Sequence, residues 1–236
     1  MRVLGIETSG DVTGVALVDE KGVLAELSFR HAMQLSRFLL PRTQEVLALA
    51  GCTAQDLDGI AVSIGPGSFT GLRIGVTTAK TLAYAAEVPV IGVPTLEALA
   101  LETPAPAGAL VAALMSASST DVFAALYQWS AGSLEPRAEE LMLPAAELAQ
   151  RLARTPLDVV LTGLIGPHRQ LFATTAGDRL TMTAEDHSPH PATIAAYGRR
   201  RLLAGGGDPL HALAPRYLRA SAAEARREVA ANGVTP

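Results

Sequence analysis

The chain has 236 residues, of which 49% are hydrophobic and 18% are charged, and its formal net charge is −4. This length allows one large domain or two small ones, and the charge argues against a protein that grips nucleic acid by itself. The single cysteine excludes an internal disulfide framework, and no unbroken apolar stretch reaches the length of a membrane span, so we expect a cytoplasmic protein that does not contact a membrane.

The first thirty residues carry the alternating pattern of strands. Residues 2–31 predict three strands joined by polar turns, which together make an antiparallel meander. Glu7, Thr8 and Ser9 follow the first strand directly, where a nucleotide-binding fold places groups that face a phosphate or its metal. A turn rich in hydrogen-bonding side chains is the alternative interpretation, and these residues taken alone favour it.

Helical spacing begins near residue 32 and continues to residue 50. The apolar residues of its main face are Leu35, Phe38, Leu39, Val46, Leu47 and Ala50. Pro41 lies inside this pattern and either kinks the helix or begins its main body. Leu40 and Leu49 fall outside the main face, which predicts a second apolar surface on this helix.

A β-branched run over 60–64 meets a Gly-Pro-Gly turn, and a small-residue segment with helical spacing follows. This pattern predicts a strand, a tight loop and a helix over 69–86, capped by Ser68 or Thr70. Backbone N–H groups at such a helix start suit an anion, so phosphate binding is one interpretation and a tight connection that binds nothing is the other. The candidate phosphate-binding residues are Glu7, Thr8, Ser9, Gly65, Gly67, Ser68 and Thr70.

The helix over 69–86 is apolar or small over most of its circumference. Gly71, Gly75, Ala79 and Ala83 recur every four residues and form a ridge with almost no side chain, which lets another backbone come close. A helix apolar over so much of its surface is normally buried on more than one side. A sheet and the preceding helix are one way to cover it, and a partner protein is the other.

After this helix the strand and helix pattern repeats. The proline-rich stretch 103–108 is the strongest boundary signal in the sequence. We therefore expect an N-terminal lobe over 1–102, a smaller C-terminal lobe over 103–220, and a tail over 221–236 that is helical or disordered. Within the C-terminal lobe the pattern predicts paired strands over 110–115 and 122–127, helices over 144–154 and 192–203, and a strand over 157–162.

Four segments resemble the TsaB (YeaZ) family. They are LGIETS (4–9), GPGSFTGLRIG (65–75), AKTLA (79–83) and IGVPTL (91–96), and weaker similarity continues in VFAALY (122–127) and PRYLR (215–219). The long glycine loop is restrictive enough to make this a specific match. The resemblance spans nearly the whole chain and is densest in the first hundred residues.

The resemblance implies the actin-like, Hsp70-like ATPase fold, an α/β fold with two ribonuclease-H-like lobes of mixed sheet and helices. Family members are non-catalytic partners of TsaD, the related enzyme that transfers threonylcarbamoyl to adenosine 37 of tRNA, together with the ATPase TsaE and with threonylcarbamoyl-adenylate made by TsaC. The implied partners are therefore a TsaD-type paralogue, a TsaE-type ATPase and tRNA through the complex. No catalytic residue, metal or required cofactor is implied for this chain, and vestigial ATP or ADP binding is left open.

In the family, two helices of the N-terminal lobe pack against their counterparts in TsaD as a four-helix bundle, and here they correspond to 32–50 and 69–86. The partner interface implied for this chain comprises Leu35, Leu39, Gly71, Ile74, Gly75, Thr78, Ala79 and Leu82. A homodimer through the same helices is a further expectation. The alternative function is an ATPase or phosphotransferase that uses Glu7, Thr8 and the loop over 65–70, and a metalloprotease is a third.

Two departures from related sequences bear on these alternatives. The catalytic paralogue binds its metal through a His-x-x-x-His pair, whereas here His31 begins the corresponding region and Leu35 takes the second position. His187 and His190 have a spacing compatible with a metal, but the proline-containing loop and the lack of other ligands favour a structural role. Ser-Ala-Ser at 116–118 replaces the Asp-Ala-Arg segment of many family members.

Overall fold

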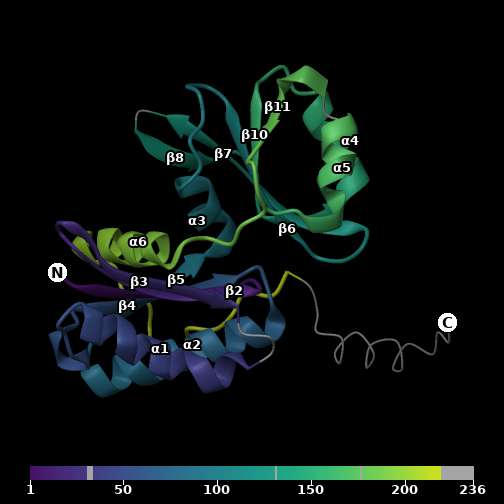
Figure 1. The fold of residues 1–236 in the computed structure, drawn as a ribbon. Helices are drawn as coiled ribbons and strands as arrows, with labels where there is room; N and C mark the ends of the chain where they lie inside the picture. The colour runs from purple at the N-terminus through teal and green to yellow at the C-terminus, as the bar shows by residue number, and fades with distance from the viewer. Residues whose placement is uncertain (31–33, 131, 176, 219–236) are drawn as a thin grey trace.

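The computed structural model of the chain describes residues 1–30, 34–130, 132–175 and 177–218. These residues form two lobes, each built around one β-sheet, which Figure 1 shows one above the other. The mixed α/β architecture with two lobes is therefore confirmed. The tail predicted over 221–236 and His31 lie outside the described residues.

The first sheet has five strands. In order across the sheet they are β3 (Gly22–Arg30), β2 (Val12–Asp19), β1 (Val3–Glu7), β4 (Gly59–Gly65) and β5 (Val90–Pro94). The first three strands of the chain form the predicted antiparallel meander, whereas β4 runs parallel to β1 and β5 runs parallel to β4. Because β1 and β4 are parallel neighbours, the residues that follow them lie at the same edge of the sheet.

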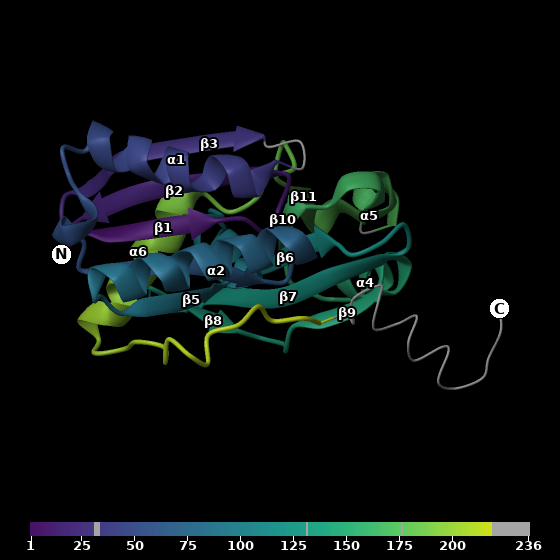
Figure 2. The same cartoon turned by 90° about the horizontal axis from the view of Figure 1, so that it is seen from below.

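Two helices cover one face of this sheet. Figure 2 shows α1 (Leu35–Leu49) over β2 and β3, beside α2 (Phe69–Ala86), which packs on β4. Their apolar side chains form one core with β1, β2 and β4. Helix α1 begins at Leu35, so Pro41 lies inside the helix instead of starting it. The 3₁₀ helix η1 (Ala54–Asp56) leads from α1 into β4.

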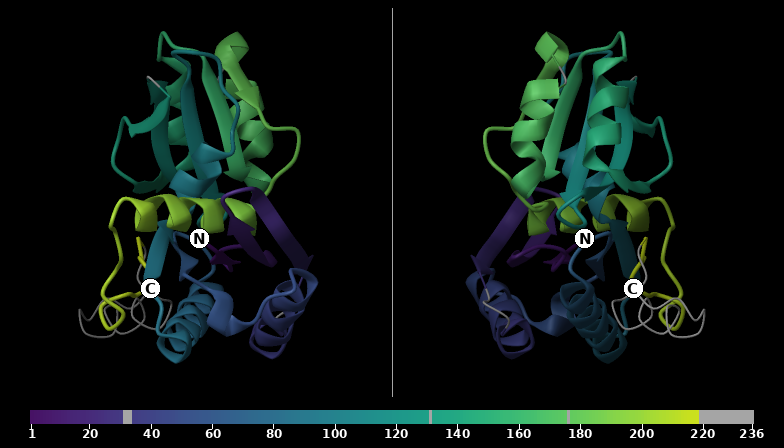
Figure 3. Two further views of the ribbon diagram at one scale, coloured as in Figure 1. Left: turned by 90° about the vertical axis from the view of Figure 1, so that its left-hand side faces the viewer. Right: turned by 90° about the vertical axis from the view of Figure 1, so that its right-hand side faces the viewer.

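The opposite face of the first sheet is covered by α6 (Pro191–Leu203), which lies between this sheet and the second lobe (Figure 3). The approach is close, because a Cβ atom built on Gly198 would overlap the side chain of Ala61 in β4. The predicted boundary of a C-terminal lobe over 103–220 is therefore wrong at its end. Local periodicity predicts this helix correctly but carries no information on which sheet it covers.

The second sheet has six strands. They are β11 (Leu180–Met182), β10 (Val159–Leu164), β6 (Leu110–Ser116), β7 (Asp121–Ser130) and β8 (Ser133–Pro136) in order, with β9 (Leu141–Pro144) also paired to β7. Helices α4 (Ala145–Ala153) and α5 (Arg169–Thr175) pack in one core with it, and α3 (Thr95–Leu101) packs in another. The short helices η2 (Gly166–His168) and η3 (Gly177–Arg179) precede α5 and β11. The paired strands predicted over 110–115 and 122–127 are confirmed.

Candidate functional site

The structure brings the two predicted phosphate-binding segments together. We call residues 7–9 the β1 turn and residues 65–71 the α2 loop. The backbone N–H of Ser68 donates to the carbonyl oxygen of Ser9 at 2.7 Å. A Cβ atom built on Gly67 would lie 2.5 Å from that same oxygen, so only glycine permits this approach. The two segments therefore pack on each other as one unit at the edge of the first sheet.

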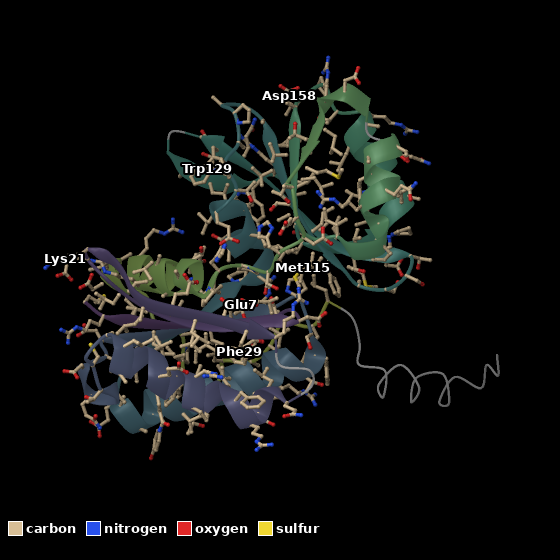
Figure 4. All side chains as sticks on the ribbon, viewed as in Figure 1. Glu7, Lys21, Phe29, Met115, Trp129 and Asp158 are labelled. Atoms are coloured by element: carbon tan, nitrogen blue, oxygen red, sulfur yellow. The ribbon has the colours of Figure 1, made fainter. Side chains whose placement is uncertain are left out.

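Glu7 is the buried acid of this unit. Figure 4 shows it where the two lobes meet, and its side chain is only 1% exposed. One carboxylate oxygen accepts hydrogen bonds from the backbone N–H and the hydroxyl of Ser9, while the other has no partner among the described residues. Burial raises the pKa of Glu7 from 4.5 to about 7, against the lowering effect of the Ser9 hydrogen bonds and of the nearby Ser63 hydroxyl. Nothing in the sequence pattern singled out Ser63, because its contact depends on the pairing of β1 with β4.

Three donors next to the candidate phosphate site, the N–H groups of Thr8, Ser68 and Gly71, are engaged inside the chain. Ser68 caps α2 as predicted, with its hydroxyl accepting from the N–H of Gly71 at 3.2 Å, while Thr70 is exposed. The N–H of Thr8 donates to the Ser63 hydroxyl at 3.1 Å. These bonds tie the β1 turn to β4 and close the first turn of α2, so the three N–H groups are not free for an anion in this arrangement.

The second lobe also closes over the β1 turn. A Cβ atom built on Gly10 would overlap the hydroxyl of Ser188 and lie 2.8 Å from the side chain of Leu164. At the α2 loop, a Cβ atom on Gly65 would lie 2.7 Å from the carbonyl oxygen of Arg216. Both contacts come from distant parts of the sequence, and both occupy space next to the candidate phosphate-binding residues.

The small-residue ridge of α2 faces the sheet of its own lobe. A Cβ atom on Gly71 would overlap the backbone oxygen of Thr8, and one on Gly75 would overlap the hydroxyl of Thr8. Ala79 in α2 is also buried against this lobe, and so are Leu35 and Leu39 in α1. None of these three side chains is more than 2% exposed. The assignment of Leu35, Leu39, Gly71, Gly75 and Ala79 to a partner interface is therefore wrong, because their own lobe already covers them.

The other three predicted interface residues remain at the surface. Ile74, Thr78 and Leu82 are half-buried and spaced four residues apart, so they follow one flank of α2. On α1, Leu40 and Leu49 are 46% and 68% exposed. Nine residues correspond to two and a half turns, so these two leucines flank the buried face on opposite sides and do not form the single second surface that the sequence predicts.

The exposed positions of α2 are mostly uncharged, and Arg73 is the one cation among them. Its exposed members with no charge are Thr70, Thr77, Thr81, Tyr84 and Ala85, and Tyr84 is 76% exposed. The two cations of α2 both bind residues 213–217. The Arg73 guanidinium donates to the Tyr217 hydroxyl at 3.0 Å, and the Lys80 ammonium donates to the Leu213 carbonyl at 2.9 Å. Apart from Arg73, the exposed positions of α2 therefore carry no charge.

The histidine pair does not converge on one point. The Nε2 atom of His187 lies 3.6 Å from a carboxylate oxygen of Glu102, and Nδ1 of His190 lies 3.8 Å from one of Glu26. In the part of the chain that the structure describes, no three His, Cys, Asp or Glu side chains are placed to hold a metal ion.

The segment at 116–118 has a local structural role. The Ser118 hydroxyl donates to the Asp121 carboxylate at 2.7 Å, and the Ser116 hydroxyl donates to the Ser118 carbonyl at 3.2 Å. Nε2 of His168 lies 3.0 Å from that same carbonyl oxygen. These contacts hold the turn between β6 and β7 next to η2.

Two lobes of mixed sheet, with an acidic turn after β1 and a glycine loop that starts a long helix, define a protein of the actin-like ATPase fold. A ROK hexokinase from Thermus thermophilus shares this fold, with a TM-score of 0.53 and 13% identity over 87% of this chain and 100% of that one. YeaZ from Pseudomonas aeruginosa is more similar, with a TM-score of 0.75 and 26% identity over 92% of this chain and 99% of that one.

The sequence relatives identify the family. Residues 18–227 match the family model described as TsaD, tRNA N6-adenosine threonylcarbamoyltransferase. The chain is 33% identical over 228 residues to the tRNA threonylcarbamoyladenosine biosynthesis protein TsaB of Bacillus subtilis strain 168, covering 96% of this chain and 97% of that protein. The chain belongs to the TsaB family of tRNA threonylcarbamoyladenosine biosynthesis proteins. Among the described residues, no helix combines the length and apolar character that crossing a bilayer requires.

Proposed function

We propose that this chain is the non-catalytic subunit that binds and activates a TsaD-type paralogue for threonylcarbamoyl transfer to adenosine 37 of tRNA. The observation that carries the proposal is the largely uncharged exposed side of α2, on which Arg73 is the one cation among the exposed positions described, beside α1 with its exposed leucines. Two further points support it: family membership, and the engagement of the Thr8, Ser68 and Gly71 N–H groups within the chain.

The geometry favours helix-to-helix binding. Helices α1 and α2 lie side by side on one face of the sheet (Figure 2), so two partner helices laid against them would complete a four-helix packing. The contact residues that we now propose are Tyr84, Thr77, Thr81 and Ala85, with Ile74, Thr78 and Leu82 at the flank. Covering Tyr84 is the largest apolar contribution, of about 1.5–3 kcal/mol for a side chain of this size class.

Activation then means support of the partner's competent arrangement rather than chemistry in this chain. A TsaE-type ATPase and tRNA would join through the paralogue. Reconstituted tRNA modification with and without this chain tests the proposal, and we expect threonylcarbamoyladenosine to form only when the chain is present. Failure of the two proteins to associate at micromolar concentrations in gel filtration and calorimetry would contradict it.

A matched pair of variants tests the surface itself. Thr81 in α2 and Thr174 in α5 are both exposed, and each hydroxyl donates to the carbonyl four residues earlier, at 2.9 and 3.0 Å. Thr81→Arg should weaken partner binding at least about tenfold, because a buried unpaired charge is costly at an interface. Thr174→Arg should leave binding unchanged. Sedimentation of the isolated chain shows whether the same face also forms a homodimer, which Thr81→Arg would then disrupt.

The alternative function, an ATPase or phosphotransferase, predicts a different result. Magnesium-ATP would then raise the melting temperature, and ATP turnover would be abolished by Glu7→Gln. We expect neither, because binding would first have to free the N–H groups that Ser9, Ser63 and Ser68 now accept from.

A further inference from the structure

After α6 the chain returns along the first lobe to the start of α2. Residues 205–217, which we call the strap, follow the free edge of the first sheet, and Figures 2 and 3 show this segment in yellow beside β5 and α2. The N–H of Asp208 donates to the Val90 carbonyl at 2.9 Å, and its carboxylate accepts from the N–H of Gly92 at 2.7 Å. Lys80 then holds the middle of the strap through the carbonyls of His211 and Leu213, at 3.4 and 2.9 Å.

The end of the strap is packed on the first turn of α2. The ring of Tyr217 lies 4.7 Å from the ring of Phe69, measured between centroids. The Arg73 guanidinium lies 3.9 Å above the Phe69 ring and donates to the Tyr217 hydroxyl. The N–H of Arg216 donates to the carbonyl of Ile64 at 2.7 Å, next to the α2 loop. The end of the strap thus contacts β4 beside the α2 loop and the first turn of α2.

The same end of the strap also reaches the second lobe. The Arg216 guanidinium lies 3.1 Å from a carboxylate oxygen of Glu140, just before β9. The Glu140 side chain is 11% exposed and that of Arg216 is 47% exposed, so this pair is partly open to water. Two adjacent side chains therefore bind different lobes: the Arg216 guanidinium binds the second lobe, and the Tyr217 ring binds α2 of the first lobe.

We propose that the strap is a mechanical tie that transmits the position of the second lobe to the first turns of α2. Arg216 and Tyr217 are adjacent in the chain, so under this proposal a movement of Glu140 that pulls on the Arg216 side chain also displaces the backbone next to Tyr217. Conversely, loss of the aromatic contact frees Arg216 to leave Glu140. The tie is a property of the isolated chain and goes beyond the proposed partner binding, so its test needs no partner.

Hydrogen exchange of the isolated chain tests the tie from the second lobe. Glu140→Gln removes the ion pair and should speed amide exchange in residues 64–76 and 205–217 about two- to fivefold, as expected for loss of a partly exposed pair that holds a local structure closed. Glu135→Gln is the matched control, because Glu135 lies in the same lobe and pairs with Arg137 at 3.5 Å. Faster exchange around residue 140 alone, with wild-type rates in α2, would overturn the proposal.

The reverse experiment starts from α2. Tyr217→Ala should speed exchange in residues 137–144 of the second lobe, whereas Tyr217→Phe, which keeps the ring, should do so less. If the two contacts are ends of one tie, the double variant Glu140→Gln with Tyr217→Ala adds little to the larger single effect. Full additivity would show two independent local contacts and would refute the tie. Melting temperatures within a few degrees of wild type establish that all variants remain folded.

Discussion

Replacement of Gly75 by leucine tests whether the small-residue ridge of α2 packs against its own lobe or against a partner protein. A Cβ atom at this position would overlap the Thr8 hydroxyl and lie 3.0 Å from the Thr8 methyl group. Thr8 is fully buried and lies at the end of a central strand, so it has no free space to move into. We therefore expect Gly75→Leu to destabilise the isolated chain.

The size of the effect follows from overpacking. Forcing extra methylene groups into a filled core costs about 1–3 kcal/mol and sometimes more, and leucine adds four carbons at a site with no room for the first. We expect a loss of about 3 kcal/mol or more, which for a chain of this length lowers the melting temperature by roughly 6–12 °C.

Thermal unfolding followed by circular dichroism measures this directly. Ala85→Leu is the control, because it adds a larger apolar side chain on the exposed face of the same helix and should leave the melting temperature unchanged. The double variant Gly75→Ala with Thr8→Ala should be more stable than the sum of its single effects predicts, since each change makes room for the other. The reasoning is refuted if Gly75→Leu melts like wild type but no longer binds the TsaD-type partner, because the ridge would then face outward.

Three further predictions concern the β1 turn and the α2 loop. Because burial raises the pKa of Glu7 from 4.5 to about 7, the folded chain binds the proton more tightly than the unfolded chain. The free energy of unfolding should therefore fall as pH rises across this interval, by roughly 3 kcal/mol. The difference in unfolding free energy between pH 5 and pH 8, measured in urea, should be smaller for Glu7→Gln than for wild type, and an equal difference would assign the effect to another group. Ser68→Ala removes the cap of α2 and should cost about 1 kcal/mol, seen as a melting temperature lowered by roughly 2–4 °C, whereas no change would mean that solvent serves the Gly71 N–H equally well. Ser63→Ala leaves the buried N–H of Thr8 without its acceptor and should cost about 1–3 kcal/mol in urea unfolding, while the exposed Thr70→Ala should cost little.

Several elements of this protein follow from local sequence alone. The antiparallel meander comes from alternation over 2–31, and α2 is predicted near 69–86, because glycines precede it and Ser68 or Thr70 can accept a hydrogen bond from its first turn. These signals act within a few residues, so they survive without knowledge of the fold. The family resemblance follows from the same glycine loop, whose spacing is restrictive.

Tertiary structure alone decided what each apolar surface contacts. The ridge of Gly71, Gly75 and Ala79 suits a sheet and a partner helix equally well, because small side chains permit any close backbone; Thr8 at the end of β1 fills that place. Likewise, the periodicity of α6 predicts a helix but not its return to the first lobe, and no local pattern announces that Asp208 pairs with Val90 or Arg216 with Glu140. Periodicity defines which face of an element is buried, whereas the partner of that face depends on chain segments distant in sequence, and only the folded arrangement brings them together.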